Sequence, residues 1–181
     1  MLSWLSTFST RRFILHSSTL ILLAIVLTTG YRLFALEQLE RVVAEEMKLH
    51  DDAITLQNLR YHTTQIQQYL TDASLTGDAD AISEAKQHQA STLPLLDELS
   101  KLDLGALTEL LKQQVSVGQQ MVSAYNQGDK REGDRLMKAS GIGFDAISDE
   151  INTKVERALS LQTDRMEASQ AIAEAGQLHI R

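Results

Sequence analysis

Apolar residues repeat every three or four positions along most of the chain, the spacing that places them on one face of an α-helix. The first such run continues without glycine or proline from Tyr31 to Thr76. Its apolar phase contains Leu36, Leu39, Val43, Met47, His50, Ile54, Leu59, His62, Ile66, Leu70 and Ala73. Because the segment TGDAD then supplies a glycine stop and a capping aspartate, the pattern predicts one long helix that ends near residue 77.

Three further helical runs follow the first. They extend from about Asp80 to Leu102, from about Ala106 to Asn126, and from about Asp134 towards the C-terminus. Pro94 lies inside the second run and predicts a kink or a restart of the helix after Leu93. The segment GIG at 141–143 weakens the last run locally, and its stripe is expected to include Ile142.

Short turns between these helices make them antiparallel neighbours. The sequence therefore predicts an all-α protein with an up-down-up-down four-helix bundle, in which the first and fourth helices are the long ones. A two-helix stalk of residues near 36–54 and 150–172 would extend from one end of this bundle.

Residues 13–36 form the most apolar part of the chain, centred on LILLAIVL. As a helix, 24 residues span about 36 Å, enough to cross a hydrocarbon core of about 30 Å. Arg11 and Arg12 precede this segment, which predicts a cytoplasmic N-terminus at 1–12 and a periplasmic domain at 37–181. We therefore expect a single-pass anchor in the inner membrane, with a cleaved signal peptide or a twin-arginine export signal as alternatives.

Charge and composition narrow the function further. Residues 1–36 carry three arginines and no acid, whereas the rest of the chain carries 14 basic and 24 acidic side chains. An acidic body argues against nucleic-acid binding. The absence of cysteine from the sequence excludes disulfides and thiolate metal sites. No spacing typical of a hydrolase, a phosphate-binding loop or a zinc protease is present, so we expect no enzyme, catalytic residue or resident cofactor.

Two segments resemble a known family. QIQQYLTDASLTGD at 65–78 resembles a motif in the first periplasmic helix of methyl-accepting chemotaxis receptors with four-helix-bundle sensor regions. AYNQGDKREGDRLMKASGIGFDAI at 124–147 is similar to the pattern at the distal turn of those sensors. The resemblance implies a ligand-sensing region that transmits signals through helix packing.

Receptors of this family continue into a second membrane helix and a cytoplasmic signalling domain. Residues 160–181 contain no apolar run long enough to span a membrane. The expectation is therefore a sensor region without the second membrane helix and without the cytoplasmic output.

Several polar residues are candidates for ligand binding because they are expected near the distal end of the bundle. They are Arg60, His62, Gln65, Tyr69, Asp72 and Arg135. Turn geometry predicts that His62 lies level with Asp145 and Tyr69 level with Met137 or Lys138, with His50 and His88 on other faces. The alternative for each of them is an ordinary packing or solvated role.

Three functions remain open at this point. The favoured hypothesis is a membrane-anchored periplasmic sensor for an amino or organic acid, or for a periplasmic binding protein that carries one, acting as a homodimer. The second is an exported bundle that binds b-type haem or a metal. The third is a structural, membrane-tethered coiled coil.

Overall fold

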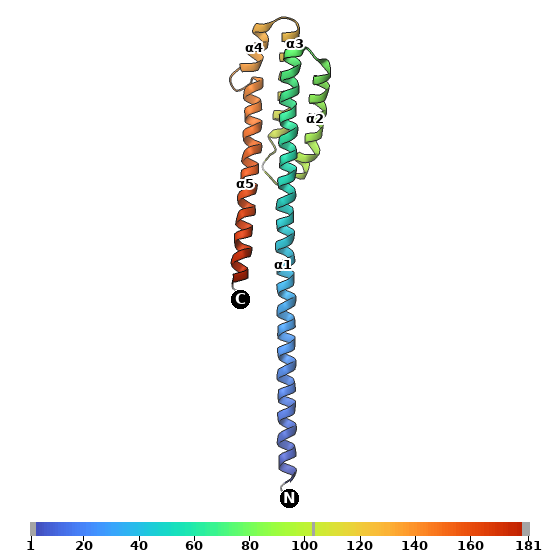
Figure 1. The fold of residues 1–181 in the computed structure, drawn as a ribbon, viewed down its shortest axis with the longest axis vertical. Helices are drawn as coiled ribbons and strands as arrows, with labels where there is room; N and C mark the ends of the chain where they lie inside the picture. The colour runs from blue at the N-terminus through green and yellow to red at the C-terminus, as the bar shows by residue number, and fades with distance from the viewer. Residues whose placement is uncertain (1–2, 103, 179–181) are drawn as a thin grey trace. The chain divides into compact units, whose positions relative to one another are not determined.

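The computed structural model describes the backbone of residues 3–102 and 104–178, and the side chains of residues 14–102 and 104–172. Helices make up most of this part of the chain, which contains no strand. They are α1 (Ser3–Thr76), α2 (Ala79–Glu98), α3 (Leu107–Asn126), α4 (Lys130–Lys138) and α5 (Phe144–Leu178) (Figure 1). The predicted all-α class is therefore confirmed.

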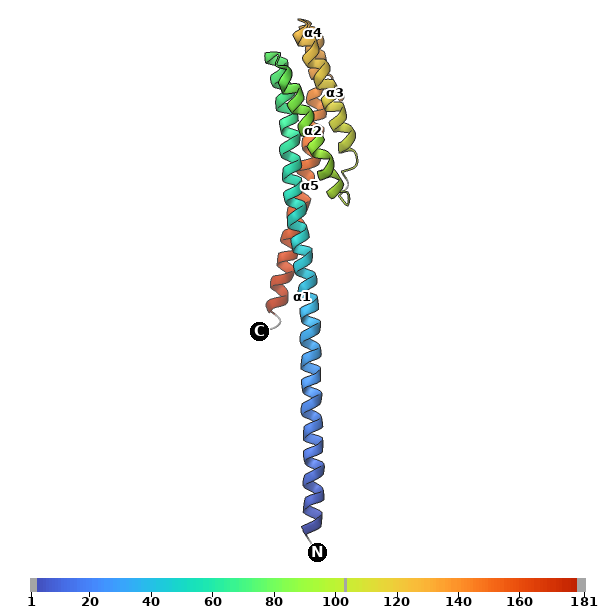
Figure 2. The same cartoon turned by 90° about the vertical axis from the view of Figure 1, so that its right-hand side faces the viewer.

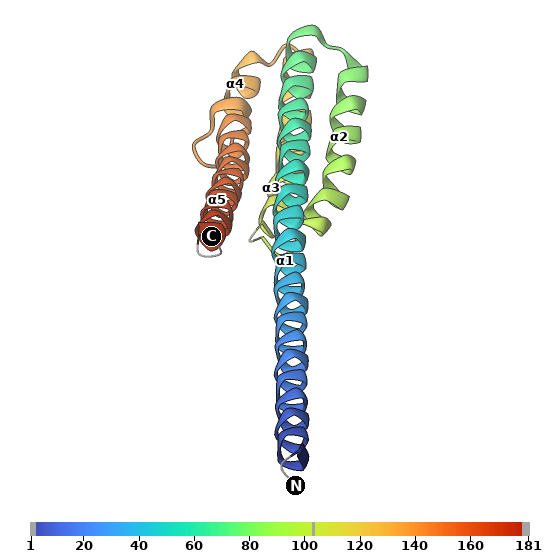
Figure 3. The same ribbon diagram turned by 60° about the horizontal axis from the view of Figure 1, so that its bottom comes forward.

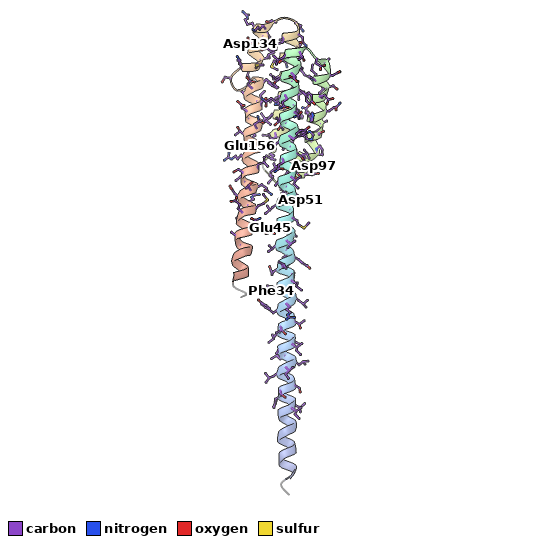
Figure 4. The ribbon with its side chains drawn as sticks, in the orientation of Figure 1. Phe34, Glu45, Asp51, Asp97, Asp134 and Glu156 are labelled. Atoms are coloured by element: carbon purple, nitrogen blue, oxygen red, sulfur yellow. The ribbon has the colours of Figure 1, made fainter. Side chains whose placement is uncertain are left out.

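The chain divides into two units, one up to Glu45 and one from Glu46 onwards. The described part of the first unit is a single helical segment, and its large apolar side chains from Ile14 to Leu36 are all exposed. Phe34 and Glu45 are labelled on this segment in Figure 4. Hydroxyl groups along it donate to the carbonyl oxygens of their own helix, as Thr28 does to Ala24 at 2.8 Å. Such bonds within one helix satisfy its hydroxyl groups, so the apolar segment needs no other element to supply hydrogen-bond partners.

One segment of the described residues, within the N-terminal part of α1, is long and apolar enough to cross a membrane. This agrees with the predicted span at 13–36.

The second unit has its core between the latter part of α1 and helices α2, α3 and α5. Figures 2 and 3 show these helices running alongside residues 46–76 of α1. The largest fully buried apolar side chains are Leu56, Leu59, Ile66 and Leu70 of α1, Leu99 just after α2, Leu107, Leu111 and Met121 of α3, and Phe144 and Ile151 of α5. Burial of each such side chain contributes about 1.5–3 kcal/mol, so this core fixes the helices around α1.

The end of α1 follows the predicted glycine stop. Gly77 has φ +74°, and its N–H donates to the carbonyl of Ala73 at 3.0 Å. A left-handed residue at this point closes the last turn, and glycine adopts that conformation without a Cβ penalty. Asp78 then caps α2 by accepting a hydrogen bond from the N–H of Asp80 at 2.9 Å.

Of the kink or restart predicted at Pro94, the restart is wrong, because α2 continues through Pro94 to Glu98. Proline removes the hydrogen bond to the carbonyl four residues earlier, here that of Ala90. Pro94 and Ala90 are both exposed, so water can replace the missing donor and the helix persists.

The predicted single fourth helix is also wrong, because residues 139–143 separate α4 from α5. Gly141 has φ +74°. A Cβ on Gly143 would lie 2.5 Å from the backbone nitrogen of Ala139, so the loop folds back on itself more closely than another residue allows. Ile142, expected in the buried stripe, is 69% exposed as part of this loop, while Phe144 enters the core.

Candidate functional site

The six predicted site residues do not form one site. Arg60 makes an exposed ion pair with Glu156 of α5, labelled in Figure 4, at 2.9 Å. Arg135 pairs with Glu132 of its own helix. The remaining two polar candidates on α1 stay on its accessible side, since Gln65 donates to Gln68 at 2.9 Å and Asp72 is exposed. Only His62 and Tyr69 are brought into a common cluster.

His62 contacts a second histidine, contrary to the prediction. Its Nδ1 lies 2.7 Å from Nδ1 of His88 on α2. In the sequence, Ile82, Ala85 and Gln89 mark one helical stripe of α2, whereas the residues that the structure buries are Ala81, Ala85 and Thr92. His88 stands three residues after Ala85 and four before Thr92, so it shares their face. A change of phase by one residue along α2 would have identified it from the sequence.

Two tyrosines complete this group, which we call the His–Tyr cluster: Tyr61, His62, Tyr69 and His88. The ring of Tyr69 stacks on that of His88, with centroids 5.5 Å apart and planes at 23°. Tyr61 meets both histidines edge to face, at 5.2 and 5.8 Å. Aromatic pairs in these geometries add about 0.5–1.5 kcal/mol beyond burial, so the cluster joins α1 to α2.

The electrostatics of the cluster favour a neutral His62. Burial lowers the pKa of His62, and the nearby charge of His88 lowers it further. In the neutral pair one Nδ1–H donates to the lone pair of the other Nδ1. When both rings are protonated, neither nitrogen can accept and the two cations repel. The link between α1 and α2 therefore depends on the protonation of this pair.

The geometry of the two histidines is that of a hydrogen bond. An iron or zinc ion between two opposed imidazoles needs about 2.0–2.1 Å to each nitrogen, or about 4 Å between them, and the observed separation is 2.7 Å. Among the residues that the structure describes, no three His, Asp or Glu side chains group together as metal ligands. The cluster can hold two helices together and respond to protons.

The predicted levels along the helices are also wrong. His62 of α1 was expected at the same position along the helix axes as Asp145. By the same geometry, Arg60 would lie opposite residue 147. The observed partner of Arg60 is Glu156, nine residues later. The loop at 139–143 accounts for part of this displacement, because its five residues lack the steady rise of a helix. Tyr69 stacks on His88 of α2.

The second predicted motif, 124–147, has a structural role in the joint between α3 and α4. Tyr125 donates its hydroxyl to Asp134 Oδ1 at 2.6 Å, and this bond to a carboxylate raises the pKa of Tyr125 to about 12. A Cβ on Gly133 would lie 2.7 Å from the Tyr125 ring. The glycine is therefore required for the ring to pack over α4.

Within the core, a glycine of α3 permits a second close approach. A Cβ on Gly118 would lie 2.7 Å from Leu70 of α1 and 3.0 Å from Phe144 of α5. This point connects three helices. It is not predictable from the sequence, because a lone glycine inside a helical pattern carries little signal.

No protein-family model, curated protein or solved structure matches this chain. The resemblance of 65–78 and 124–147 to chemotaxis receptors stays a prediction. The contacts within the second unit and the apolar segment of α1 are therefore the basis for the proposed function.

Proposed function

We propose that this protein is a membrane-anchored, ligand-sensing module of the chemotaxis-receptor kind, in which a ligand biases the packing of α1 against α5. The observation that supports this most is the continuity of α1 from Ser3 to Thr76. The segment apolar enough to span a membrane and the segment that carries the core residues Leu56 to Leu70 are parts of one helix. A helix of this kind can transmit small shifts of about 1–2 Å.

We further propose that α1, α2, α3 and α5 form an up-down-up-down four-helix bundle, with α4 as part of the distal turn. One polar contact in each neighbouring pair supports this order. The four contacts are His62 to His88 for α1–α2, Gln89 Nε2 to the Leu111 carbonyl for α2–α3, Gln114 Nε2 to Ser148 Oγ for α3–α5, and Gln162 Nε2 to the Leu49 carbonyl for α5–α1. Buried polar pairs of this type select a single register, because any shift leaves them without partners.

The proposed location is the inner membrane, with residues 1–12 in the cytoplasm and the acidic body in the periplasm. The charge pattern supports this orientation, since Arg11 and Arg12 precede the apolar segment and all 24 acids follow it. The proposed oligomer is a homodimer. Val43, Met47 and Ile54 of α1 are apolar and exposed, and a second copy would cover them as in a coiled coil.

Topology is tested with the cysteine-free chain, in which single cysteines can be placed at Ser6 and at Ser140. A membrane-impermeant maleimide applied to intact cells is expected to label the Ser140→Cys variant. It should label the Ser6→Cys variant only after the membrane is permeabilised. Equal labelling of both variants in intact cells contradicts the orientation.

Signal transmission is tested with spin labels at Asn58 of α1 and Thr153 of α5, both exposed. The full chain is placed in lipid nanodiscs and screened for thermal stabilisation by amino acids and organic acids. A compound that raises the melting temperature should also shift the distance between the labels. If no compound stabilises the protein or moves the labels, the protein is a structural tether and the sensor proposal fails.

A further inference from the structure

A cavity of about 560 Å³ opens between residues 101, 102 and 104, which follow α2, and the face of α5 between residues 154 and 165. This volume lies within the range of small-molecule sites in proteins, about 300–1,000 Å³. None of the six predicted site residues lines it. We call it the basic pocket, for the side chains described next.

Four of the nine described lining residues are cationic, and none is acidic. They are Lys101, Lys154, Arg157 and Arg165. The whole chain has a formal charge of −7, so this concentration of positive charge runs against the composition. Lys154 is 3.7 Å from Glu150. Within the described residues, the other three have no carboxylate within 4.0 Å. The pocket therefore has cations that an anion can pair with.

A fifth cation, Lys48 of α1, lies close to the pocket residue Lys101. Lys48 lowers the pKa of Lys101, by hydrogen bonding and by charge repulsion, against a smaller opposing effect of Asp52. Two ammonium groups in contact repel each other, and a bound anion would relieve that repulsion.

The rest of the lining is suited to an apolar ligand body. Leu104 is buried, and Leu102, Ala158 and Leu161 present carbon atoms to the cavity. On α5 the two arginines lie eight residues apart, or about 12 Å along the helix axis. Positive charges at both ends of an apolar surface fit a molecule with two acidic groups separated by carbon atoms.

The pocket also adjoins the contact between α5 and α1. Gln162 lines it, is 1% exposed, and donates Nε2 to the carbonyl of Leu49 at 3.0 Å. A ligand lying against α5 here would contact the residue that fixes α5 to α1.

We propose that the basic pocket binds an organic anion in which carboxylate or phosphate groups flank an apolar body, and that Arg157 and Arg165 hold its two ends. Arginine suits this role because its planar guanidinium pairs with carboxylate or phosphate through two parallel hydrogen bonds. This deepens the proposed sensor function by naming the ligand class and its site. Binding in the pocket does not itself require that function.

The test measures binding of suberate, an unbranched dicarboxylate, to the full chain in phosphatidylcholine nanodiscs by calorimetry. Suberamide is the neutral analogue, and inorganic phosphate is an anion without an apolar body. We expect suberate to bind at least tenfold more tightly than either. Arg157→Gln and Arg165→Gln are each expected to weaken suberate binding about tenfold, which corresponds to about 1.4 kcal/mol. Lys86→Gln and Lys112→Gln, on exposed faces away from the pocket, are matched controls for the change in charge.

Equal binding of suberate and suberamide, or equal loss of suberate affinity in the control variants, overturns the proposal.

Nanodiscs that contain phosphatidylglycerol distinguish a lipid source of the anion from a free acid. If suberate affinity falls as phosphatidylglycerol rises, and Arg157→Gln removes that competition, the natural ligand is a lipid phosphate in the same pocket. Unchanged affinity supports a soluble acid. Binding without any change in the distance between α1 and α5 supports the pocket but contradicts the sensor.

Discussion

Residues 20–27 and residues 56–70 belong to the same helix, and both are rich in leucine and isoleucine, but their surroundings are opposite. In the first segment, the large apolar side chains are between 55% and 66% exposed. In the second, Leu56, Leu59, Ile66 and Leu70 are 0% exposed, and polar residues occupy the other faces. A helix that is apolar all round needs a lipid or protein environment on every side, whereas a helix with one apolar stripe needs only one packing partner.

The comparison shows that hydrophobicity alone does not define a core. Mutations in the two segments should therefore affect different properties: those at 56–70 should change the stability of the second unit, and those at 20–27 should change membrane insertion. Single substitutions along α1 test this distinction.

Leu70→Ala should reduce the free energy of unfolding of the second unit by about 2–5 kcal/mol, because it leaves a cavity beside Gly118 and Phe144. Thermal unfolding followed by circular dichroism measures the effect. Leu75→Ala is the control, since Leu75 is 78% exposed on the same helix. Equal destabilisation by the two variants would falsify the assignment of the buried stripe.

Leu23→Arg should impair membrane insertion by about 2.5–3.5 kcal/mol, the cost of a charge near the centre of a spanning helix. The fraction of protein in the membrane pellet measures this effect. The melting temperature of the second unit should stay the same, because Leu23 lies in the exposed N-terminal segment. A variant that inserts normally would show that residues 20–27 do not span the bilayer.

The His–Tyr cluster should make stability depend on pH. The pKa of His62 is lowered in the folded state, so above the unfolded value of about 6.5 both states are neutral and the contact is fully stabilising. As pH falls below this value, the unfolded chain binds protons first, and stability decreases until the pH passes the folded pKa. Melting temperatures between pH 7.5 and 5.5 measure this slope.

His88→Asn should flatten that slope by removing the partner of His62. His50→Asn, an exposed position on α1 outside the cluster, is the control and should leave the slope unchanged. A slope of the same size in wild type and His88→Asn would show that the pair does not control the pH response.

Arg60→Gln should change stability by no more than about 1 kcal/mol, because its ion pair with Glu156 is exposed on both sides. The small effect should disappear at high salt concentration, where the charges are screened. A loss as large as that of Leu70→Ala would mean that Arg60 has a buried role that the structure does not show.

Much of the fold could be predicted from the sequence, because local patterns determine helices. The end of α1 at Gly77 and the cap of α2 by Asp78 follow from backbone preferences of a few residues. The apolar span followed from composition alone. Errors occurred where a local rule was weak, as at Pro94, where exposure lets the helix continue, and at 139–143, where two glycines allow a loop.

The candidate site was predicted only in part. His62 and Tyr69 were identified, but their partners Tyr61 and His88 were not, because a shift of one residue in the stripe of α2 moves a side chain to another face. The basic pocket escaped prediction entirely. Its cations come from segments about fifty residues apart, and only packing brings Lys101 beside α5.

The sequence by itself determined the all-helical class, the apolar N-terminal segment and the end of α1, since each depends on neighbouring residues and on the general preferences of the backbone. Only the tertiary structure decided which histidine meets His62, how far α5 is displaced along α1, and where positive charge gathers. The physical reason is that these features depend on the register between helices. Register is set jointly by loop lengths, close glycine contacts and buried polar pairs, and no single segment contains that information.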